Sequence, residues 1–388
     1  MDLIASFELF KVPPRWLFLR VETASGVVGW GEPNVEGFSD TVATAVEELM
    51  VSVVGEDASR IQRIWIKLVK QRFYIAGGGG PILMSAVAGI DQALWDIAGK
   101  TLGVPVHRML GGAVRERLRV YRWCGGDDNT PEEAAAEAKA VLEGSNFKQL
   151  KMNACARMSY LDCDGAVAAA AARMKAVREA VGPSVGIGLD FHGRVKLPTA
   201  KRLMAALAPY DPLFFEEVVV GGQNPALAAL AAATTVPLAT GERMYTTEHF
   251  RDLLEARAVS IVQPDVSHAG GISQMLTIAR LAEAYEVGLA PHCPLGPIAL
   301  ASCMQVRARA RAWVQVLASA RPDWDAAPCA GAECSPPPPP SPLPRAHARC
   351  TRIRLMFASS NALACVLVAG RRRVRKLSLP GDKPRHPL

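Results

Sequence analysis

Three short apolar stretches decide the fold of this 388-residue chain: residues 185–190 read VGIGLD, residues 213–216 read LFFE and residues 237–242 read PLATGE. Each has the length of a buried strand, and each ends in a carboxylate. The three carboxylates, Asp190, Glu216 and Glu242, follow one another at intervals of 26 residues. The segments between them have the apolar spacing of helices, so the sequence predicts parallel strands joined by helices.

The strand and helix pattern repeats on both sides of these stretches, from Gly111-Gly112 to about residue 300. This repeat predicts an α/β barrel of (β/α)7β type. We expect its strands at residues 118–123, 147–153, 185–190, 213–216, 237–242, 259–265 and 287–292. Helices are expected between them, among others at residues 165–181, 198–209 and 272–285. The eighth strand is doubtful, because residues 312–317 are followed by a segment of different character.

The chain before the barrel predicts a smaller α+β domain. Residues 3–32 alternate as in antiparallel strands, with breaks at Pro13-Pro14 and Ser25-Gly26. Helical spacing follows at residues 41–54, 59–72 and 84–103. We therefore expect an α+β domain at residues 1–112 and a barrel at residues 113–317.

The last part of the chain, residues 318–388, lacks barrel periodicity and contains the run Pro336–Pro340 and a basic end at residues 371–376. A polyproline run forms neither a buried strand nor a buried helix, so we expect a disordered or loosely attached tail. Our hypothesis is that the sequence after about Gln305 comes from an altered reading frame or an unspliced intron. The C-terminal return segment that such barrels have in the family described below is therefore also doubtful.

The charge balance separates this end from the body of the protein. The whole chain has a formal net charge of +7. Residues 305–388 hold 15 Lys and Arg against 4 Asp and Glu, a charge of +11, so residues 1–304 carry −4. The body has no excess of positive charge, and we expect no nucleic-acid partner. Binding of nucleic acid or of an acidic membrane face by the basic tail is kept as an alternative.

Composition and cysteine usage indicate a reduced, cytoplasmic protein, although an organelle would also fit. Residues 355–370 are apolar, but they are too few for a membrane span and contain polar side chains, so no membrane association is expected. The nine cysteines form no CxxC pair, and residues 1–11 lack the features of a signal peptide. We expect a homo-oligomer, with buried reduced cysteines at Cys124, Cys155, Cys163, Cys293 and Cys303.

The carboxylates at the strand ends predict a metal site. The active site of a β/α barrel lies at the carboxyl ends of its strands, where Asp190, Glu216 and Glu242 should converge. Three clustered negative charges repel one another unless a cation lies between them. Ligands that offer only oxygen favour a hard divalent ion, and we expect Mg²⁺. Glu217 points to the opposite side of its strand from Glu216, so only one of the two can be a ligand.

Two histidines are expected at the same end of the barrel. His292 ends the seventh strand, and Asp265 ends the sixth strand beside it. An aspartate that accepts from one imidazole nitrogen raises the basicity of the other, as a general base requires. His192 follows Asp190 by two residues and should approach the metal from another side, which suggests one proton acceptor and one proton donor. We interpret His249 and His268 as solvated surface residues.

Two polar residues end the second predicted strand on the same side. Lys151 and Asn153 could hold carboxylate or hydroxyl oxygens of a substrate, or form a structural polar cap. Removal of a proton next to a carboxylate leaves a dianionic intermediate, which needs a metal ion and fixed donors on the carboxylate oxygens. A Mg²⁺ ion with a histidine base is one arrangement that stabilises it, and enolase-type sites are the known example.

Eight further stretches of the chain carry a resemblance to a known family. They are residues 13–17 (PPRWL), 29–33 (GWGEP), 86–96 (AVAGIDQALWD), 151–153 (KMN), 190–194 (DFHGR), 241–243 (GER), 263–265 (QPD) and 290–297 (APHCPLGP). With these motifs, residues 1–304 resemble the mandelate racemase subgroup of the enolase superfamily. Within that subgroup the likeness is greatest to dehydratases of sugar acids.

The resemblance implies an N-terminal domain that caps the barrel and Mg²⁺ on the three carboxylates. It also implies that His292, with Asp265 behind it, takes a proton from C2 of the sugar acid. His192 would then protonate the departing C3 hydroxyl. The expected activity is that of a hydro-lyase acting on D-galactonate, with 2-keto-3-deoxygalactonate as the product.

Three features depart from the family pattern. Val218 follows the Glu216-Glu217 pair, where the family usually has proline. Residues 73–80 lack an arginine that the dehydratases carry near this point, which bears on substrate selection. The eighth strand of the family presents a glutamate that helps to stabilise the transition state, whereas residues 312–317 contain no carboxylate. The alternatives are a related acid-sugar dehydratase, a racemase or epimerase of the superfamily, or a relative made inactive by its altered C-terminus.

Overall fold

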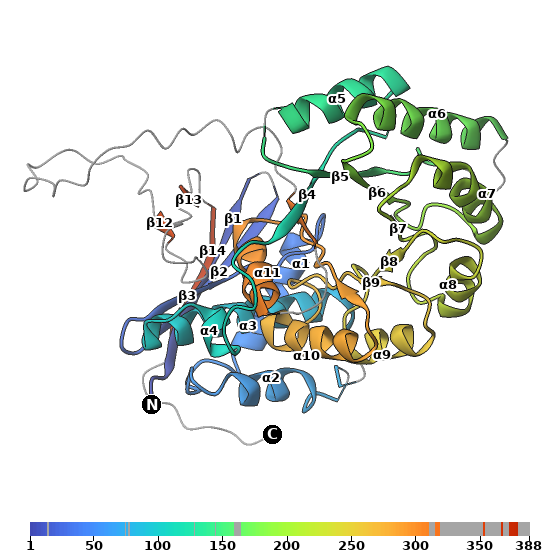
Figure 1. Cartoon of the computed structure of the whole chain (residues 1–388). Coiled ribbons are helices and arrows are strands. Elements are labelled where there is room, and N and C mark those ends of the chain that lie inside the picture. Colours follow the sequence, from blue (N-terminus) through green and yellow to red (C-terminus); the bar gives the residue numbers. More distant parts are fainter. Residues whose placement is uncertain are drawn as a thin grey trace, which may run out of the picture.

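The chain folds into an N-terminal sheet with helices and a larger parallel sheet that curls into a barrel wall (Figure 1). The computed structural model describes residues 1–13, 15–73, 75–76, 78–127, 129–143, 145–158, 164–309, 315–318, 352–353, 366–367 and 372–378. The two domains expected from the sequence are both present as sheets of the predicted kind, antiparallel first and parallel second. Their exact bounds stay predictions.

The first domain is built on an antiparallel sheet of order β14-β1-β2-β3. Its N-terminal strands are β1 (Ile4–Val12), β2 (Trp16–Thr23) and β3 (Val28–Gly31). Apolar side chains of β1 and β2, such as Leu9 and Leu19, are buried against the helices. Those helices are α1 (Ser39–Met50), α2 (Ile61–Val69) and α3 (Gly80–Leu102).

Helix α3 lies between the sheet and the barrel and is buried along most of its length. It can lie this close to β3 because glycines face one another: a β-carbon on Gly31 would collide with the carbonyl oxygen of Gly89. The helix ends at Gly103, whose φ of +67° is the left-handed conformation that glycine adopts at little cost. A short helix, α4 (Val106–Met109), leads into the barrel.

The second domain is a parallel sheet of order β10-β9-β8-β7-β6-β5-β4-β11. Its strands are β4 (Arg119–Trp123), β5 (Gln149–Asn153), β6 (Gly186–Asp190), β7 (Phe214–Glu216), β8 (Leu238–Thr240), β9 (Ile261–Val262), β10 (Gly288–Leu289) and β11 (Gln315–Ala318). All seven predicted strands are present. The doubtful eighth strand is also present as β11, which pairs with β4. Within the described residues no ladder joins β10 to β11, so the wall has an open seam there.

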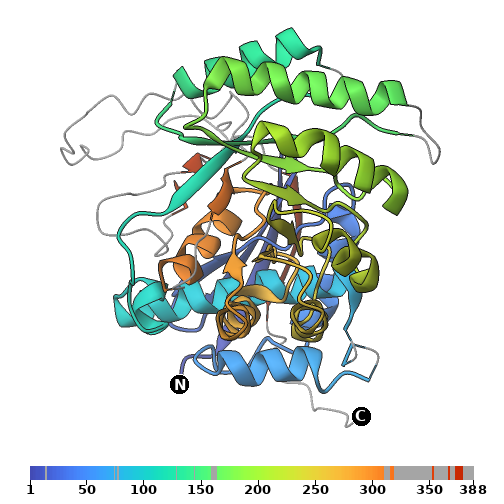
Figure 2. The same cartoon turned by 45° about the vertical axis from the view of Figure 1, so that its right-hand side comes forward.

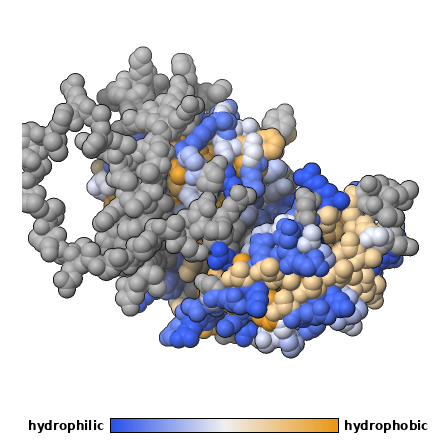
Figure 3. Space-filling view, turned by 90° about the horizontal axis from the view of Figure 1, so that it is seen from above, coloured by the Kyte–Doolittle hydropathy of each residue, from blue (hydrophilic) through white to orange (hydrophobic). Residues whose placement is uncertain are grey.

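Helices cover the outside of this wall (Figure 2). They are α5 (Pro131–Glu143), α6 (Asp164–Val181), α7 (Leu197–Leu207), α8 (Asn224–Ala231), α9 (Thr247–Glu255), α10 (Gly271–Ala284) and α11 (Pro297–Arg309), with a 3-10 turn at Ala208–Tyr210. The outer face over α5 and α6 mixes hydrophilic residues with mildly apolar ones (Figure 3), in keeping with their alanine-rich sequences. No helix among the described residues is long and apolar enough to span a membrane.

The register of the strands sets the positions of the polar side chains. Asn153 of β5 pairs with Asp190 of β6, and Asp190 pairs with Glu216 of β7. An isolated parallel bridge joins Asp265 to His292 beyond the ends of β9 and β10. Because neighbouring strands end at one level, their last side chains meet at one mouth of the barrel.

The barrel interior below this mouth is filled by side chains. Tyr121, Phe214 and Ala239 form a small buried cluster of their own. The ring of Phe214 occupies the space where a β-carbon of Gly188 would lie. Side chains two residues apart on a strand share a face, so Asp190 extends towards the interior above Gly188. The acidic side chains therefore lie on a packed apolar floor.

The two domains are joined by hydrogen bonds to buried carboxylates. Glu32, which follows β3, accepts from the backbone N–H of Gly296 at 2.6 Å and of Ala299 at 3.0 Å. Asp91 of α3 accepts from the hydroxyl of Ser273 at 2.5 Å and from its backbone N–H at 3.0 Å. These contacts hold the first domain against the helices and loops that surround the mouth.

The predicted tail is described only in part. Strand β14 (Arg372–Ser378) pairs antiparallel with β1 at the edge of the first sheet, and β12 (Arg352–Ile353) pairs with β13 (Val366–Leu367). The tail thus contributes a strand to the first domain. The run Pro336–Pro340 and most of residues 355–370 lie outside the described residues, as does Cys163. Cys124, Cys155, Cys293 and Cys303 are buried free cysteines, as the sequence predicts.

Candidate active site

Three carboxylates meet at the carboxyl ends of consecutive strands. Asp190 and Glu216 are the last residues of β6 and β7, and Glu242 lies two residues after β8. One oxygen from each side chain lies within 4.8 Å of the others. Asp190 and Glu216 are buried, whereas the side chain of Glu242 is 11% exposed. The regular spacing in the sequence therefore brings these three residues together.

A single buried ammonium group lies among these carboxylates. Lys151 of β5 places its Nζ 2.8 Å from Oδ2 of Asp190 and in contact with Oε1 of Glu216. Burial would lower the pKa of Lys151, but Asp190 and Glu216 outweigh it and raise that pKa well above its ordinary value. Lys151 thus faces Asp190 and Glu216, whereas Glu242 lies 3.1 Å from Nε2 of His292 and 3.5 Å from Nε of Arg243.

The pKa values of two of these acids are shifted in opposite directions. Burial and then the charge of Asp190 raise the pKa of Glu216 to about 7, although Lys151 opposes the shift. Burial would also raise the pKa of Asp190, but Lys151 and His192 together hold it below its ordinary value. Gln263 supports Glu216 by donating from Nε2 to Oε2 at 2.6 Å. The three carboxylates, each with one oxygen within 4.8 Å of the others, could hold a metal ion at the mouth.

His292 stands beside Glu242 and is held from behind by Asp265. Its Nδ1 lies 2.8 Å from Oδ2 of Asp265, and its Nε2 lies 3.1 Å from Oε2 of Glu242. Burial would lower the pKa of His292, but the carboxylates of Glu242 and Asp265 raise it to about 9. Asp265 is itself fixed by the backbone N–H of Ser267, at 2.8 Å. The dyad that the sequence predicts is therefore formed.

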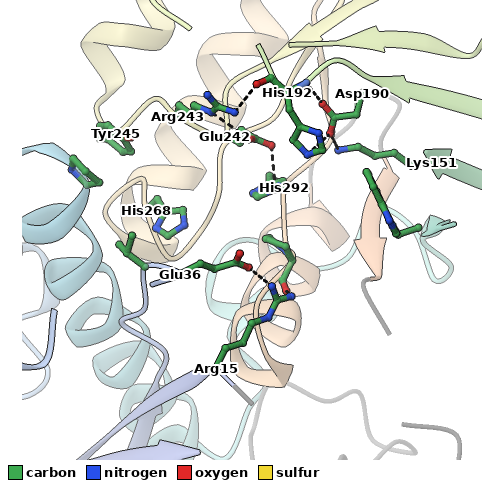
Figure 4. Close-up of a pocket in the computed structure, with 14 residues that line it drawn as sticks. Arg15, Glu36, Lys151, Asp190, His192, Glu242, Arg243, Tyr245, His268 and His292 are labelled. Atoms are coloured by element: carbon green, nitrogen blue, oxygen red, sulfur yellow. Dashed lines mark hydrogen bonds and ion pairs between the residues drawn. The ribbon is translucent and has the colours of Figure 1, made fainter. Parts of the chain in front are cut away.

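His192 approaches from the Asp190 side of the cluster. Its Nε2 lies 3.3 Å from Oδ2 of Asp190, and its backbone N–H donates to Oδ1 at 2.8 Å. Its φ of +50° is in the left-handed region, which is uncommon for a residue other than glycine and is found at functional sites. Burial lowers the pKa of His192 despite the charge of Asp190. The two histidines thus contact different carboxylates of the cluster: His192 lies beside Asp190 and His292 lies beside Glu242 (Figure 4).

A pocket of about 480 Å³ opens above these groups. Five of the predicted site residues line it, namely Lys151, Asp190, His192, Glu242 and His292. The remaining lining residues are Arg15, Val35, Glu36, Pro81, Trp123, Arg243, Tyr245, His268 and Pro294. Both domains contribute to this wall, so the first domain covers one side of the mouth (Figure 4).

Family models match both domains. The model of the mandelate racemase / muconate lactonizing enzyme N-terminal domain matches residues 13–111, and the enolase C-terminal domain-like model matches residues 133–331. The chain belongs to the mandelate racemase/muconate lactonizing enzyme family of the enolase superfamily. The resemblance inferred from the sequence motifs is thereby confirmed.

Curated and solved relatives of this family agree with the assignment. The chain is 53% identical over 303 residues to D-galactonate dehydratase of Ralstonia pickettii and to D-galactonate dehydratase of Ralstonia nicotianae, with 78% of each chain covered in both cases. A solved enolase-superfamily member from Salmonella Typhimurium superposes with a TM-score of 0.78 at 28% identity, covering 82% of this chain and 88% of that one.

Asn153 takes a position different from that of Lys151. Its Nδ2 donates to Oδ1 of Asp127, which also accepts from Arg194 at 2.8 Å. Asn153 does not line the pocket, and its backbone oxygen accepts from buried Arg173. These contacts fit the structural polar cap that the sequence left open, but the buried Oδ1 of Asn153 has no hydrogen-bond partner among the described residues, and its role towards substrate stays a prediction.

The interpretation of His268 as a solvated surface residue is wrong. Its side chain is only 14% exposed and lines the pocket. Its Nδ1 lies 2.8 Å from the hydroxyl of Ser85 on α3, and its Nε2 lies 4.0 Å from Asp265. The spacing of Asp265 and His268 places them one turn apart, which was a signal in the sequence. His249 is exposed, as expected.

Glu217 and Arg243 form an ion pair beside the cluster. Glu217 turns away from the three carboxylates, with a φ of +43°, and its Oε2 lies 2.9 Å from Nη2 of Arg243. Burial and then the charge of Glu242 raise the pKa of Glu217 to about 9. Arg243 also donates to the backbone oxygen of His192 at 2.9 Å. Sequence reasoning gave Arg243 no role, although it belongs to the motif at residues 241–243.

Proposed function

We propose that this protein is a hydro-lyase that removes water from a sugar acid, with D-galactonate as its substrate and 2-keto-3-deoxygalactonate as its product. The observation that carries the proposal is the meeting of three carboxylates within 4.8 Å, flanked by His292 and His192. The substrate is supported by the relatives named D-galactonate dehydratase, at 53% identity.

Asp190, Glu216 and Glu242 would hold Mg²⁺. The donor set fits a hard cation because every ligand atom is a carboxylate oxygen. Oδ2 of Asp190 lies 2.8 Å from Nζ of Lys151, and Oε2 of Glu242 lies 3.1 Å from Nε2 of His292, and each carboxylate oxygen has a second lone pair that a metal could use. A bound divalent ion would stabilise the negative charge that proton removal places on the carboxylate of the substrate.

His292 would act as the general base in its neutral form, which a divalent ion held by Glu242 would favour by offsetting the carboxylate that raises the pKa of His292. Its Nε2 takes the proton from C2, and the electron pair of the C–H bond moves towards the C1 carboxylate. The hydrogen bond to Asp265 fixes Nδ1–H as the donor, which leaves Nε2 as the basic nitrogen. Lys151, with its Nζ beside Asp190 and Glu216, provides positive charge close to the same carboxylate.

His192 would act as the general acid in its protonated form, which the carboxylates of Asp190 and Glu242 favour against its burial. The electron pair returns from the C1 carboxylate, the bond between C3 and its hydroxyl oxygen breaks, and a proton from His192 completes the water molecule. The enol that remains takes up a proton at C3 and becomes the 2-keto acid. Hydrogen bonds from the backbone of His192 to Asp190, and from Arg243 to its carbonyl, keep this side chain on the Asp190 side.

A keto-acid assay with matched histidine variants tests the proposal. The full chain, His292→Asn and His249→Asn would each be incubated with D-galactonate in Mg²⁺ and in EDTA. We expect formation of keto acid by the full chain and by His249→Asn in Mg²⁺ only, and a loss of at least about 100-fold in His292→Asn. Equal rates in all three proteins, or turnover that EDTA leaves unchanged, would contradict the proposal.

Epimerisation at C2 is the second candidate, because two histidines on different sides of the cluster could exchange a proton on the two faces of C2. The same assay separates the reactions, since an epimerase forms a sugar acid without a keto group. A folded protein that binds D-galactonate and forms neither product would be an inactive relative. The segment Gln315–Ala318, which contains no carboxylate, would then be the first place to restore a glutamate.

A further inference from the structure

The wall of the pocket opposite the three carboxylates carries an ion pair from the first domain. Nη1 of Arg15, in the turn between β1 and β2, lies 2.5 Å from Oε1 of Glu36, in the loop between β3 and α1. Figure 4 shows this pair across His292 from Asp190 and Lys151. Both side chains line the pocket, and about two fifths to one half of each is exposed to it and to solvent.

The pair is held in place by the loops that carry it. Buried Asn34 donates to the backbone oxygen of Arg15 at 2.8 Å and accepts from the hydroxyl of Ser39 at 2.7 Å. Arg15 also donates from Nη2 to the carbonyl of Pro294 at 2.7 Å. Pro294 lies two residues after His292 in the chain, so the pair has a fixed position relative to the proposed base.

We infer that Arg15 and Glu36 select an acid with a single carboxylate and a neutral hydroxymethyl end, and reject the corresponding acid with a carboxylate at both ends. This inference rests on the proposed function and adds which class of sugar acid the same site takes. With C1 at the three carboxylates, the other end of the substrate meets this pair.

Hydrogen bonding explains the selection. A hydroxyl group both donates and accepts, so it can accept from the guanidinium of Arg15 and donate to the carboxylate of Glu36 at the same time. An ionised carboxylate only accepts, so it can use Arg15 but must face the negative charge of Glu36. Glu36 is thus the residue that rejects a second carboxylate, and Arg15 is the residue that both kinds of acid share.

Two ligands of matched stereochemistry test the inference. D-galactonate and galactarate differ only at C6, which is a hydroxymethyl group in one and a carboxylate in the other. The dissociation constants of both would be measured by calorimetry in Mg²⁺ buffer for the full chain, for Glu36→Gln and for Glu48→Gln, together with initial rates. Glu48 is an exposed glutamate of α1 that does not line the pocket, so it serves as the matched control.

The ratio of the two dissociation constants is the quantity that decides. We expect the full chain and Glu48→Gln to favour D-galactonate, and we expect Glu36→Gln to reduce that preference by about tenfold, mainly through tighter binding of galactarate. Galactarate also chelates Mg²⁺ in solution. This effect is the same for every protein, so it cancels when the ratios of the dissociation constants are compared between variants.

Two results would overturn the inference, and they are distinguishable from each other. An unchanged ratio in Glu36→Gln, with D-galactonate still bound and converted by the full chain, removes the role of Glu36 but leaves the proposed function intact. Failure of the full chain to bind either acid in Mg²⁺ removes the proposed function, and the inference that rests on it falls as well.

Discussion

The buried carboxylates of the domain contact and those of the barrel mouth differ in what surrounds them. Glu32 and Asp91 join the two domains, and each accepts two hydrogen bonds from one neighbouring segment. Asp190 and Glu216 lie with Glu242 at the barrel mouth, within 4.8 Å of one another. The side chains of Glu32, Asp91, Asp190 and Glu216 are almost completely buried.

The pKa values alone do not separate these groups. Burial raises the pKa of Glu32, of Asp91 and of Glu216 to about 7 in each case. The difference lies in the neighbours, because the acids of the domain contact face backbone and hydroxyl donors, whereas those of the mouth face other carboxylates and Lys151. Convergence of like charges, rather than burial, marks the candidate metal site.

The largest expected effect comes from removal of the buried cation. Lys151→Met leaves Asp190 and Glu216 without their positive partner, which should lower the free energy of unfolding by about 3–5 kcal/mol in EDTA. Urea denaturation measures the loss, with Lys201→Met on the exposed face of α7 as the control. A Lys151→Met protein as stable as the control would show that the carboxylates do not need this charge.

A divalent ion should stabilise the fold through the acids of the barrel mouth and not through those of the domain contact. At a free Mg²⁺ concentration about 100 times the dissociation constant, binding to the folded state raises the free energy of unfolding by about 2.7 kcal/mol. We expect this increase in the full chain and in Glu32→Gln, and we expect Glu216→Gln to lose most of it. Thermal denaturation with and without Mg²⁺ measures the shift; an equal shift in both variants would contradict the distinction.

The domain contact should affect stability without affecting chemistry. The side chain of Asp91 accepts a hydrogen bond from the backbone N–H of Ser273. In Asp91→Asn an amide NH2 group can take the place of the accepting oxygen, which should lower the free energy of unfolding by about 1–3 kcal/mol. Because Asp91 does not line the pocket, kcat/KM for D-galactonate should stay within about twofold of the full chain. Loss of activity in a protein that is still folded would mean that the contact also positions the site.

The pH dependence of stability tests Asp91 in a second way. Burial raises the pKa of Asp91 from its ordinary value of 3.8 to about 7, so the folded state holds this proton more tightly than the unfolded chain. The stability from the protonated form is fully present below pH 3.8 and is lost as the pH rises through 7. Between pH 5 and pH 8, Asp91→Asn should therefore lose less stability than the full chain. Urea denaturation midpoints that fall equally in Asp91→Asn and in the full chain between pH 5 and pH 8 would contradict this.

The sequence was sufficient for residues whose position depends on strand order. Asp190, Glu216 and Glu242 end consecutive strands, and parallel strands bring such ends together whatever the loops do. The same argument found His292 and Asp265. Strand lengths were predicted less well: β9 covers only Ile261–Val262 of the expected residues 259–265, because the chain beyond it turns into the loop that carries Asp265.

Contacts between the domains were beyond the sequence. Arg15 and Glu36 reach the pocket only because the first domain packs on the mouth, and no periodicity encodes that arrangement. Asn153 shares the face of Lys151 on β5, but the loop residue Asp127 holds its side chain. Local pattern thus predicts which side chains reach the mouth, while tertiary packing decides which of them remain free to bind a ligand.

The most direct test of the proposed dehydration is to follow D-galactonate by NMR in D₂O with the full chain and Mg²⁺. The account predicts loss of the C2 proton signal and appearance of a 2-keto-3-deoxy acid that carries one deuterium at C3. Exchange of the C2 proton with retention of the C3 hydroxyl, or an unchanged spectrum from a folded protein, would contradict it.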